Sequence, residues 1–348
     1  MLRSFSNKAI ATKARAMYGA RVTQADYEEL MKKRTVGDAA AYLRDNTHYR
    51  EVLGQIDPAA IHRGQLENML RSLRYVQYQR LIAYDFGQQQ LYYYIYRWDE
   101  LQQLTALLRY LSGRGQGQAA GQYDFHYDQR LAGHTSYDLT GLVQVKSYQE
   151  LVAFLGDSPY GKILRRFPPD TSGQIDLMGC ERALSAYYYN CQLSIVNKEL
   201  KGEARADLKE RFYQRIDEEN LTQAYRLKRF FHSDPQYIRQ SLLPFPTRSG
   251  KLLDTIVDAG DLQQVHAALA KAGLMDEGAE LEGDFIERAM LRRRAKASKR
   301  DLRGASCPPV VLRAYMTQMS IELENIINII ESVRYGLPVD EMRRMLVL

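Results

Sequence analysis

Residues 35–53 read TVGDAAAYLRDNTHYREVL, and this stretch decides the organisation of the chain because it recurs. Residues 146–164, KSYQELVAFLGDSPYGKIL, align with it without a gap, so that Ser158 stands 111 residues after Thr47. A weaker third copy, DLQQVHAALAKAGL, occupies residues 261–274 at an offset of 226. A unit that returns at such intervals indicates a repeat architecture. We therefore predict three tandem helical modules, over residues 1–117, 118–235 and 236–348.

Length and composition agree with a multi-module protein. The 348 residues exceed the roughly 250–300 that one hydrophobic core supports. With 45% hydrophobic and 26% charged residues, and no apolar run near the ~18–20 residues of a membrane helix, the chain is typical of a folded soluble protein. The net charge of +6 predicts an acidic partner, which is a nucleic acid, an anionic membrane surface or an acidic protein. The three widely spaced cysteines, Cys180, Cys191 and Cys307, favour a reduced, cytoplasmic protein without disulfides or a zinc site.

The N-terminal segment is basic and has no acid before Asp26. Such a start is typical of a mitochondrial transit peptide. This segment, however, runs without a change of composition into TQADY, which opens the first module, so we interpret it as a structured first helix.

Helical spacing dominates the chain, and strand patterns are scarce. The clearest helix carries apolar residues at alternating spacings of four and three, a heptad stripe, and Gly336 and Pro338 end it. A helix of about 25 residues spans roughly 38 Å, so each module is predicted to close with a long stiff helix. These patterns predict an all-α fold. The stripe consists of Leu312, Met316, Met319, Leu323, Ile326, Ile330 and Val333.

Capping residues predict where several helices begin. Thr23 followed by Asp26 indicates the capped start of the second helix, and Thr35 caps a short helix over residues 36–45. The two long helices of module two are expected over residues 180–199 and 204–231.

In module one the long helices are expected over residues 63–83 and 89–111. Ser112 and Gly113 are predicted to end the second of them. The glycine-rich residues 113–121 then predict a linker.

Catalytic signatures do not hold up in context. Residues 115–120, GQGQAA, resemble a dinucleotide fingerprint, but they follow a predicted helix where that motif requires a strand. Residues 249–252, SGKL, resemble the end of a P-loop but lack the hydroxyl residue after the lysine. The six histidines include no pair at i, i+4 beside a carboxylate, and no serine stands in a G-x-S-x-G turn. We therefore expect no catalytic residues, no metal site and no cofactor.

Two features suit binding. The first is a basic run on the second helix of module three, in which Asp301 is the only acid. It is either a solvated helix face or a dock for an acidic helix, a headgroup or a phosphate backbone. The second is the 25 tyrosines, which we interpret mainly as core and inter-module packing, with some at interfaces. The candidate interface residues are Arg288, Arg292, Arg293, Lys296 and Arg300.

Several motifs in order carry a family resemblance. The first is TQADY at residues 23–27, followed by Leu30, Leu43, Thr47-x-Tyr49 and Leu53. The others are the module ends: Asp99 near Gln102, Asp217 near Asn220, and ELENI at 322–326 leading to Arg334-Tyr335-Gly336. On these residues the chain resembles the C subunit of the bacterial and archaeal V-type/A-type rotary ATPases, the homologue of the d subunit of the eukaryotic vacuolar pump. The third copy of the opening stretch departs from the pattern, with Gly273 where Thr47 and Ser158 stand.

The resemblance implies a non-catalytic, all-helical funnel of three modules about a pseudo-threefold axis. It implies a single copy within a hetero-oligomer, peripheral to the cytoplasmic face of the membrane. There it would act as a socket between the central shaft, which consists of the D and F subunits, and the membrane rotor ring. The alternative from another class is a basic helical-repeat scaffold that binds RNA or DNA, although the basic run is confined to one module. An enzyme comes third, because the sequence shows no convergent polar pocket.

Overall fold

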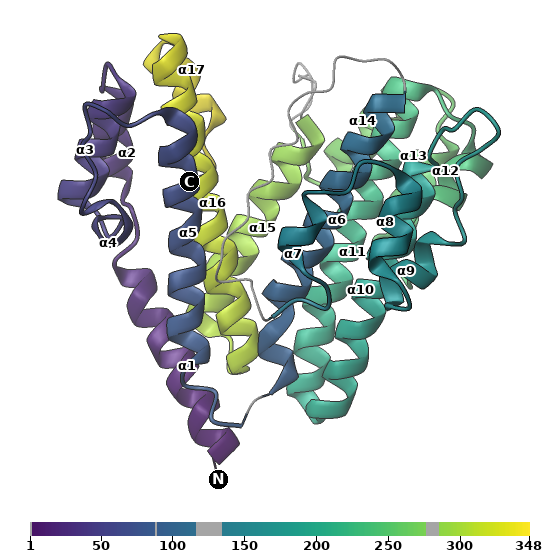
Figure 1. The fold of residues 1–348 in the computed structure, drawn as a ribbon, viewed down its shortest axis with the longest axis horizontal. Coiled ribbons are helices and arrows are strands. Elements are labelled where there is room, and N and C mark those ends of the chain that lie inside the picture. Colours follow the sequence, from purple (N-terminus) through teal and green to yellow (C-terminus); the bar gives the residue numbers. More distant parts are fainter. Residues whose placement is uncertain (1, 88, 116–133, 276–284) are drawn as a thin grey trace. The chain divides into compact units, whose positions relative to one another are not determined.

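The computed structural model describes residues 2–87, 89–115, 134–275 and 285–348 (Figure 1). Over these residues the secondary structure consists of α-helices and one short 3-10 helix, η1 (Gln90–Tyr93), which confirms the predicted all-α fold. The chain divides into two compact units. Unit 1 joins Met1–Gln88 to Leu281–Leu348, and unit 2 comprises Gln89–Glu280.

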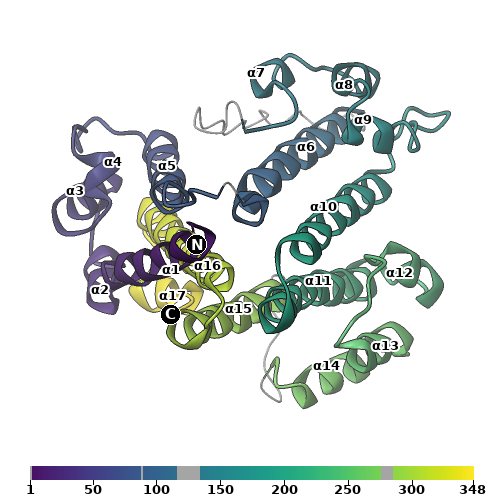
Figure 2. The same cartoon turned by 90° about the horizontal axis from the view of Figure 1, so that it is seen from below.

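Unit 1 is built around the longest of its helices, α16 (Pro308–Tyr335). Its other helices are α1 (Leu2–Gly19), α2 (Gln24–Met31), α3 (Val36–Asn46), α4 (Arg50–Leu53), α5 (Arg63–Ile82), α15 (Phe285–Gly304) and α17 (Val339–Met345). Helices α1, α5 and α15 all pack against α16 (Figure 2). Because α16 has neighbours on several sides, every residue of its predicted heptad stripe is buried.

The ends of α16 follow the sequence signals. Cys307 precedes the helix, and a proline occupies its first turn, where no intrahelical hydrogen bond is lost. At the other end Gly336 adopts the left-handed conformation, with φ of 66°, and its N–H donates to the carbonyls of Ser332 and Val333. A residue without a Cβ takes this conformation at low cost, so the predicted helix end is confirmed.

Unit 2 contains three long helices, α6 (Tyr94–Gly115), α10 (Leu177–Glu199) and α11 (Gly202–Phe231). Its shorter helices are α7 (Leu139–Leu142), α8 (Tyr148–Leu155), α9 (Pro159–Leu164), α12 (Pro235–Ser241), α13 (Gly250–Asp258) and α14 (Leu262–Lys271). Helix α10 packs against both α6 and α11, and α13 and α14 lie on α11.

The end of α6 differs from the prediction. The helix does not stop at Ser112 and Gly113 but continues to Gly115. A glycine inside a helix costs about 1 kcal/mol relative to alanine. Burial of Leu108 and Leu111 on the same helix outweighs this local cost. Residues 116–133, which hold most of the predicted linker and of the glycine motif, lie outside the described residues.

The recurring stretch begins a helix with the same cap each time. A side-chain oxygen of Thr35, Ser147 or Asp261 accepts a hydrogen bond from the backbone N–H three residues later. These caps start α3, α8 and α14 and satisfy one of the free amides of each first turn. The predicted apolar matches between the first and third copies are buried as well: Ala39, Leu43, Val265 and Leu269.

The structure corrects the ungapped alignment of the first two copies by one residue. Ser147 caps α8 and stands 112 residues after Thr35, whereas the buried Tyr160 stands 111 residues after Tyr49. The reason is Gly156, which adopts a positive φ of 50° and ends α8 early. The second copy is therefore one residue shorter between its cap and its tyrosine.

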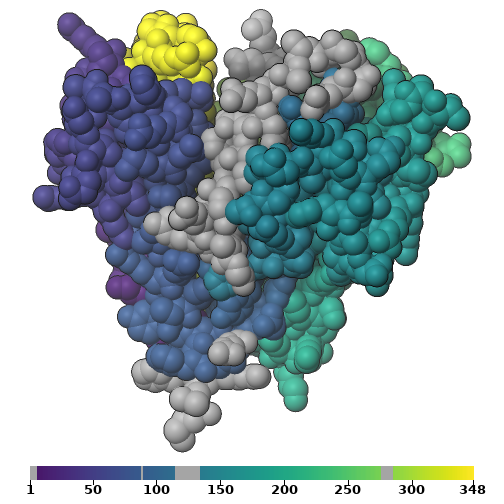
Figure 3. Space-filling view, viewed as in Figure 1, coloured from purple at the N-terminus to yellow at the C-terminus, as the bar shows by residue number. Residues whose placement is uncertain are grey.

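Unit 1 brings the two ends of the chain together. Arg15 of α1 donates through Nε to the carbonyl of Leu302 at 2.8 Å and through Nη2 to that of Ala305 at 2.7 Å. Arg343 of α17 forms an ion pair of 2.8 Å with Glu28 of α2. Figure 3 shows these neighbouring parts as yellow and purple surfaces side by side. The chain closes on itself within this unit, and the division into three modules stays a prediction.

Candidate functional site

The described residues contain no reactive centre of a familiar kind. No group of histidine, cysteine, aspartate and glutamate side chains among them could hold a metal ion. None of the described helices is both long and apolar enough to cross a membrane. The P-loop-like SGKL lies at the start of α13, where the N–H groups of Arg248 and Ser249 already donate to Oδ2 of Asp217, at 3.0 and 2.9 Å. Two amides that a phosphate cradle would use are therefore occupied.

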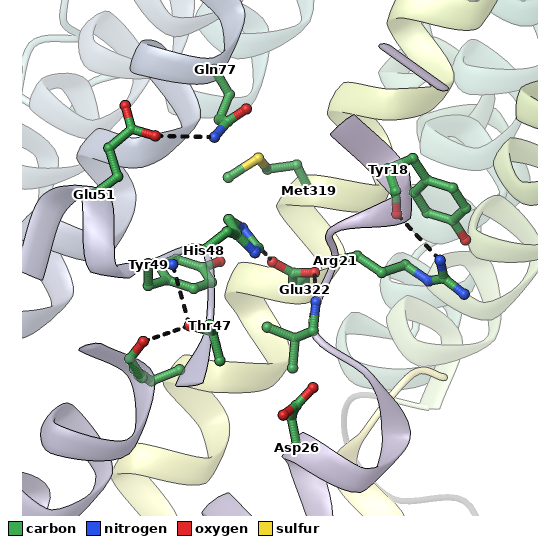
Figure 4. A network of polar contacts seen from close by, with 12 residues as sticks. Tyr18, Arg21, Asp26, Thr47, His48, Tyr49, Glu51, Gln77, Met319 and Glu322 are labelled. Carbon is green, nitrogen blue, oxygen red and sulfur yellow. Dashed lines mark hydrogen bonds and ion pairs between the residues drawn. The ribbon is translucent and has the colours of Figure 1, made fainter. Parts of the chain in front are cut away.

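The first polar centre is Glu322, a carboxylate buried on α16. Its Oε2 accepts a hydrogen bond from the N–H of Val22 at 2.9 Å, and its Oε1 lies 3.1 Å from Nε2 of His48 (Figure 4). Val22 lies between α1 and α2, and His48 between α3 and α4. Because a buried carboxylate is costly unless it is paired and hydrogen-bonded, these contacts tie both connections to α16.

Asn325 lies nearly one turn further along α16 and holds a third segment. Its Nδ2 donates to the carbonyl of Val347 at 2.9 Å, and its Oδ1 accepts from the N–H of Val347 at 3.0 Å. Both residues are buried, with exposed fractions of 3% and 5%. This reciprocal pair of hydrogen bonds, which we call the Asn325 clamp, fastens the segment after α17 to α16.

The same device recurs on α11 of unit 2. Asp217 receives the N–H groups of Arg248 and Ser249. Asn220, three residues later, exchanges two hydrogen bonds with the backbone of Leu243, at 3.2 Å to its carbonyl and 2.7 Å from its N–H. An acid and an asparagine at positions i and i+3 therefore fasten backbone segments to a long helix in each unit.

Helix α6 carries a further buried carboxylate, Glu100. Its Oε1 accepts from both the N–H and the Oγ of Ser136, and its Oε2 accepts from the hydroxyl of Tyr160 at 2.9 Å. Tyr160 belongs to the second copy of the recurring stretch. Its counterpart in the first copy, Tyr49, lies beside Glu322 (Figure 4). In both copies the tyrosine of the stretch meets a buried glutamate of a long helix.

The phenols around Glu322 are held in their neutral form. Burial, reinforced by the negative charge of Glu322, raises the pKa of Tyr27, Tyr49 and Tyr315 well above the usual value for a phenol. A phenol with a raised pKa does not act as a base near neutral pH. The arrangement therefore suits a structural joint and not proton transfer.

The interface residues predicted from the sequence lie on α15. Arg292, Arg293, Lys296 and Arg300 are exposed, and within the described ranges none of them has an ion-pair partner. Arg288 is partly buried and engaged in a contact. Residues four apart share one face of a helix, so Arg292, Lys296 and Arg300 form a line about 12 Å long. We call the four exposed residues the α15 basic face; the apolar side of the helix packs on α16.

Sequence reasoning missed the partners of the buried carboxylates. Val22 and Val347 act through backbone groups, which every residue type carries, and His48 had no companion in sequence. A signal did exist in Glu322 and Asn325, which interrupt the apolar heptad stripe. Polar side chains on the buried side of a helix require partners, so this interruption indicates attached segments without saying which.

A family model described as ATP synthase (C/AC39) subunit matches residues 10–345 of the chain. The match extends over both units and includes Glu100, Asp217 and Glu322 with the segments they hold. No curated protein matches the chain.

Proposed function

The chain belongs to the ATP synthase (C/AC39) subunit family, and from this premise we propose that it is a non-catalytic rotor subunit of a V/A-type ATPase. Family membership confirms the resemblance drawn from the sequence motifs. The match over residues 10–345 is the observation that carries the proposal. In it the chain is a socket between the D and F subunits of the shaft and the membrane ion-translocating ring, at the cytoplasmic face of the membrane and without a cofactor.

A coupling subunit must pass on torque without deforming, and the buried joints support this role. Glu322 and Asn325 fasten three separate segments to α16, and Asp217 and Asn220 fasten two to α11. Breaking such a contact leaves a buried polar group unpaired, at a cost of about 1–3 kcal/mol per group. The joints therefore resist relative movement of the helices they connect.

The coupling subunit also needs contacts with its neighbours, and we propose the α15 basic face as one of them. Its four cations are exposed and have no ion-pair partner in the described part of the chain. Single surface ion pairs contribute only about 0–1 kcal/mol, so the face acts mainly on specificity and register. An acidic surface on the shaft or the ring is its expected counterpart.

Charge reversal tests this contact. We expect Arg292→Glu with Arg293→Glu to uncouple ATP hydrolysis from ion transport in the reconstituted complex, or to release the soluble sector from the membrane. The matched control is Arg34→Glu with Lys162→Glu, which makes the same charge change at two exposed residues away from α15. Wild-type coupling in the α15 variant, or equal uncoupling in the control, contradicts the role of this face.

A pull-down tests the function itself. With this chain as bait, we expect the shaft and ring subunits to be recovered together. Recovery of RNA or DNA in their place, lost steeply as salt is raised, would favour the nucleic-acid scaffold. Recovery of neither rotor partner from membranes that contain the assembled ATPase refutes the socket proposal.

A further inference from the structure

Unit 1 contains a pocket of about 270 Å³ next to the Glu322 joint. The end of α1, the start of α2, the face of α16 and one residue of α15 line it. Met17 and Met319 contribute apolar wall, whereas Arg21, Lys299 and Gln318 contribute polar groups. Neither the joints nor the proposed contacts of the α15 basic face use this space.

Two cations border the pocket without a counter-charge of their own. Arg21 and Lys299 have no ion-pair partner among the residues that the structure describes. The guanidinium of Arg21 lies 4.4 Å from the centroid of the Tyr18 ring, and its Nη1 donates to the Tyr18 carbonyl at 3.2 Å (Figure 4). Partial burial, together with the positive charges of Arg21 and Arg303, lowers the pKa of Lys299. The positive charge on this side of the pocket is therefore in local excess.

The remaining groups do not neutralise this charge. Glu322 lines the pocket, but its oxygens are engaged by Val22 and His48. Thr23 and Gln24 place the N-terminus of α2 on the pocket wall, and a helix N-terminus favours anions.

We propose that this pocket binds a phosphoryl anion, either as free phosphate or pyrophosphate or as the phosphate chain of a nucleotide. A guanidinium matches phosphate oxygens through two parallel hydrogen bonds, and the ammonium of a lysine adds a point charge. The volume corresponds to about nine water molecules at roughly 30 Å³ each, which admits a short phosphate chain. Because the pocket lies entirely within unit 1, anion binding there is independent of the proposed coupling function.

Isothermal titration of the full chain with pyrophosphate at constant ionic strength tests the proposal. We expect saturable one-to-one binding, weakened at least about tenfold by Arg21→Gln with Lys299→Gln, because both charge-assisted contacts are lost. The matched control, Arg292→Gln with Lys296→Gln, removes the same charge from exposed residues that do not line the pocket. We expect it to change the affinity by less than about twofold, since exposed charges are screened.

Parallel titrations with phosphate and ADP identify the source of the anion. Equal affinity for ADP and pyrophosphate supports recognition of the phosphate chain alone, and tighter binding of ADP supports a nucleotide. Lys299→Met, which retains the apolar stem, and circular dichroism of each variant guard against loss of folding as the cause. Absence of saturable binding to the wild type, or equal weakening in the control, overturns the site and leaves the socket proposal untouched.

Discussion

Replacing Asn325 by alanine removes the clamp on the C-terminal segment. The N–H and the carbonyl of Val347 each lose their hydrogen bond to the side chain, which measured 3.0 and 2.9 Å. Val347 is 5% exposed, so these groups lie away from water in the folded chain. Alanine is too short to reach them.

The magnitude follows from two unpaired backbone groups. Each buried group left without a partner costs about 1–3 kcal/mol. Alanine returns up to about 0.7 kcal/mol through its higher helix propensity. We therefore expect Asn325→Ala to lower the free energy of unfolding by about 2–4 kcal/mol. For a domain of about 150–250 residues, each kcal/mol shifts Tm by about 2–4 °C, so the expected fall is about 5–15 °C.

Thermal and urea denaturation followed by circular dichroism measure this loss. The matched control is Asn328→Ala, the same substitution three residues further along α16. The Asn328 side chain makes no hydrogen bond within the described residues. We expect the control to stay within about 0.5 kcal/mol of the wild type. If the two variants have equal stability, the clamp does not hold the C-terminal segment and the reasoning is refuted.

Four further outcomes follow from the same contacts. Asn220→Ala should lower the stability of unit 2 by a similar amount, about 2–4 kcal/mol, because Leu243 loses an equivalent pair of hydrogen bonds; a loss under about 0.5 kcal/mol in urea denaturation contradicts the recurrence of the device. Glu322→Gln places an amide donor against one of the donors that the carboxylate accepts from, so urea denaturation should show a loss of about 1–3 kcal/mol. For Asp26, burial opposes but hydrogen bonds from Thr23 and Tyr42 prevail, so its pKa lies below the ordinary 3.8; its contribution to stability is present above that value and lost as pH falls through the lower folded-state pKa, so Asp26→Asn should flatten the acid limb of a stability profile, and an unchanged limb would exclude Asp26. Burial raises the pKa of Cys180 to about 11, so this thiol should resist alkylation at pH 8 until the chain is unfolded, and rapid labelling of the native chain would show that it is accessible.

Part of the site was open to prediction from the sequence. The α15 basic face was expected as a run of cations, and four of its predicted residues are exposed together. Their helical spacing places them on one side once the helix is assumed. The buried joints were visible only as polar residues within apolar stripes, such as Glu322 and Asn325.

The pocket was not open to prediction. Arg21 stood in the basic N-terminal segment and Lys299 in the basic run, and nothing in the sequence related the two. Their juxtaposition depends on α1 and α15 both packing against α16. A long-range meeting of this kind has no local signal, because any surface cation fits either stretch equally well.

The sequence by itself determined the helices and most of their ends. A cap such as Thr35 acts on an amide three residues away, and Gly336 ends α16 through its own backbone conformation, so both effects are local. The heptad stripe likewise states which side of α16 is buried. These properties need only short-range chemistry and can be read in order along the chain.

The tertiary structure alone decided which segments those buried surfaces and polar groups meet. It carried α6 through Gly113, shortened the second copy at Gly156, and brought Val347 to Asn325. The physical reason is that these contacts are made to backbone N–H and carbonyl groups or through general apolar packing. Every residue offers such groups, so the identity of the partner is set by the path of the chain in space and not by its side chain.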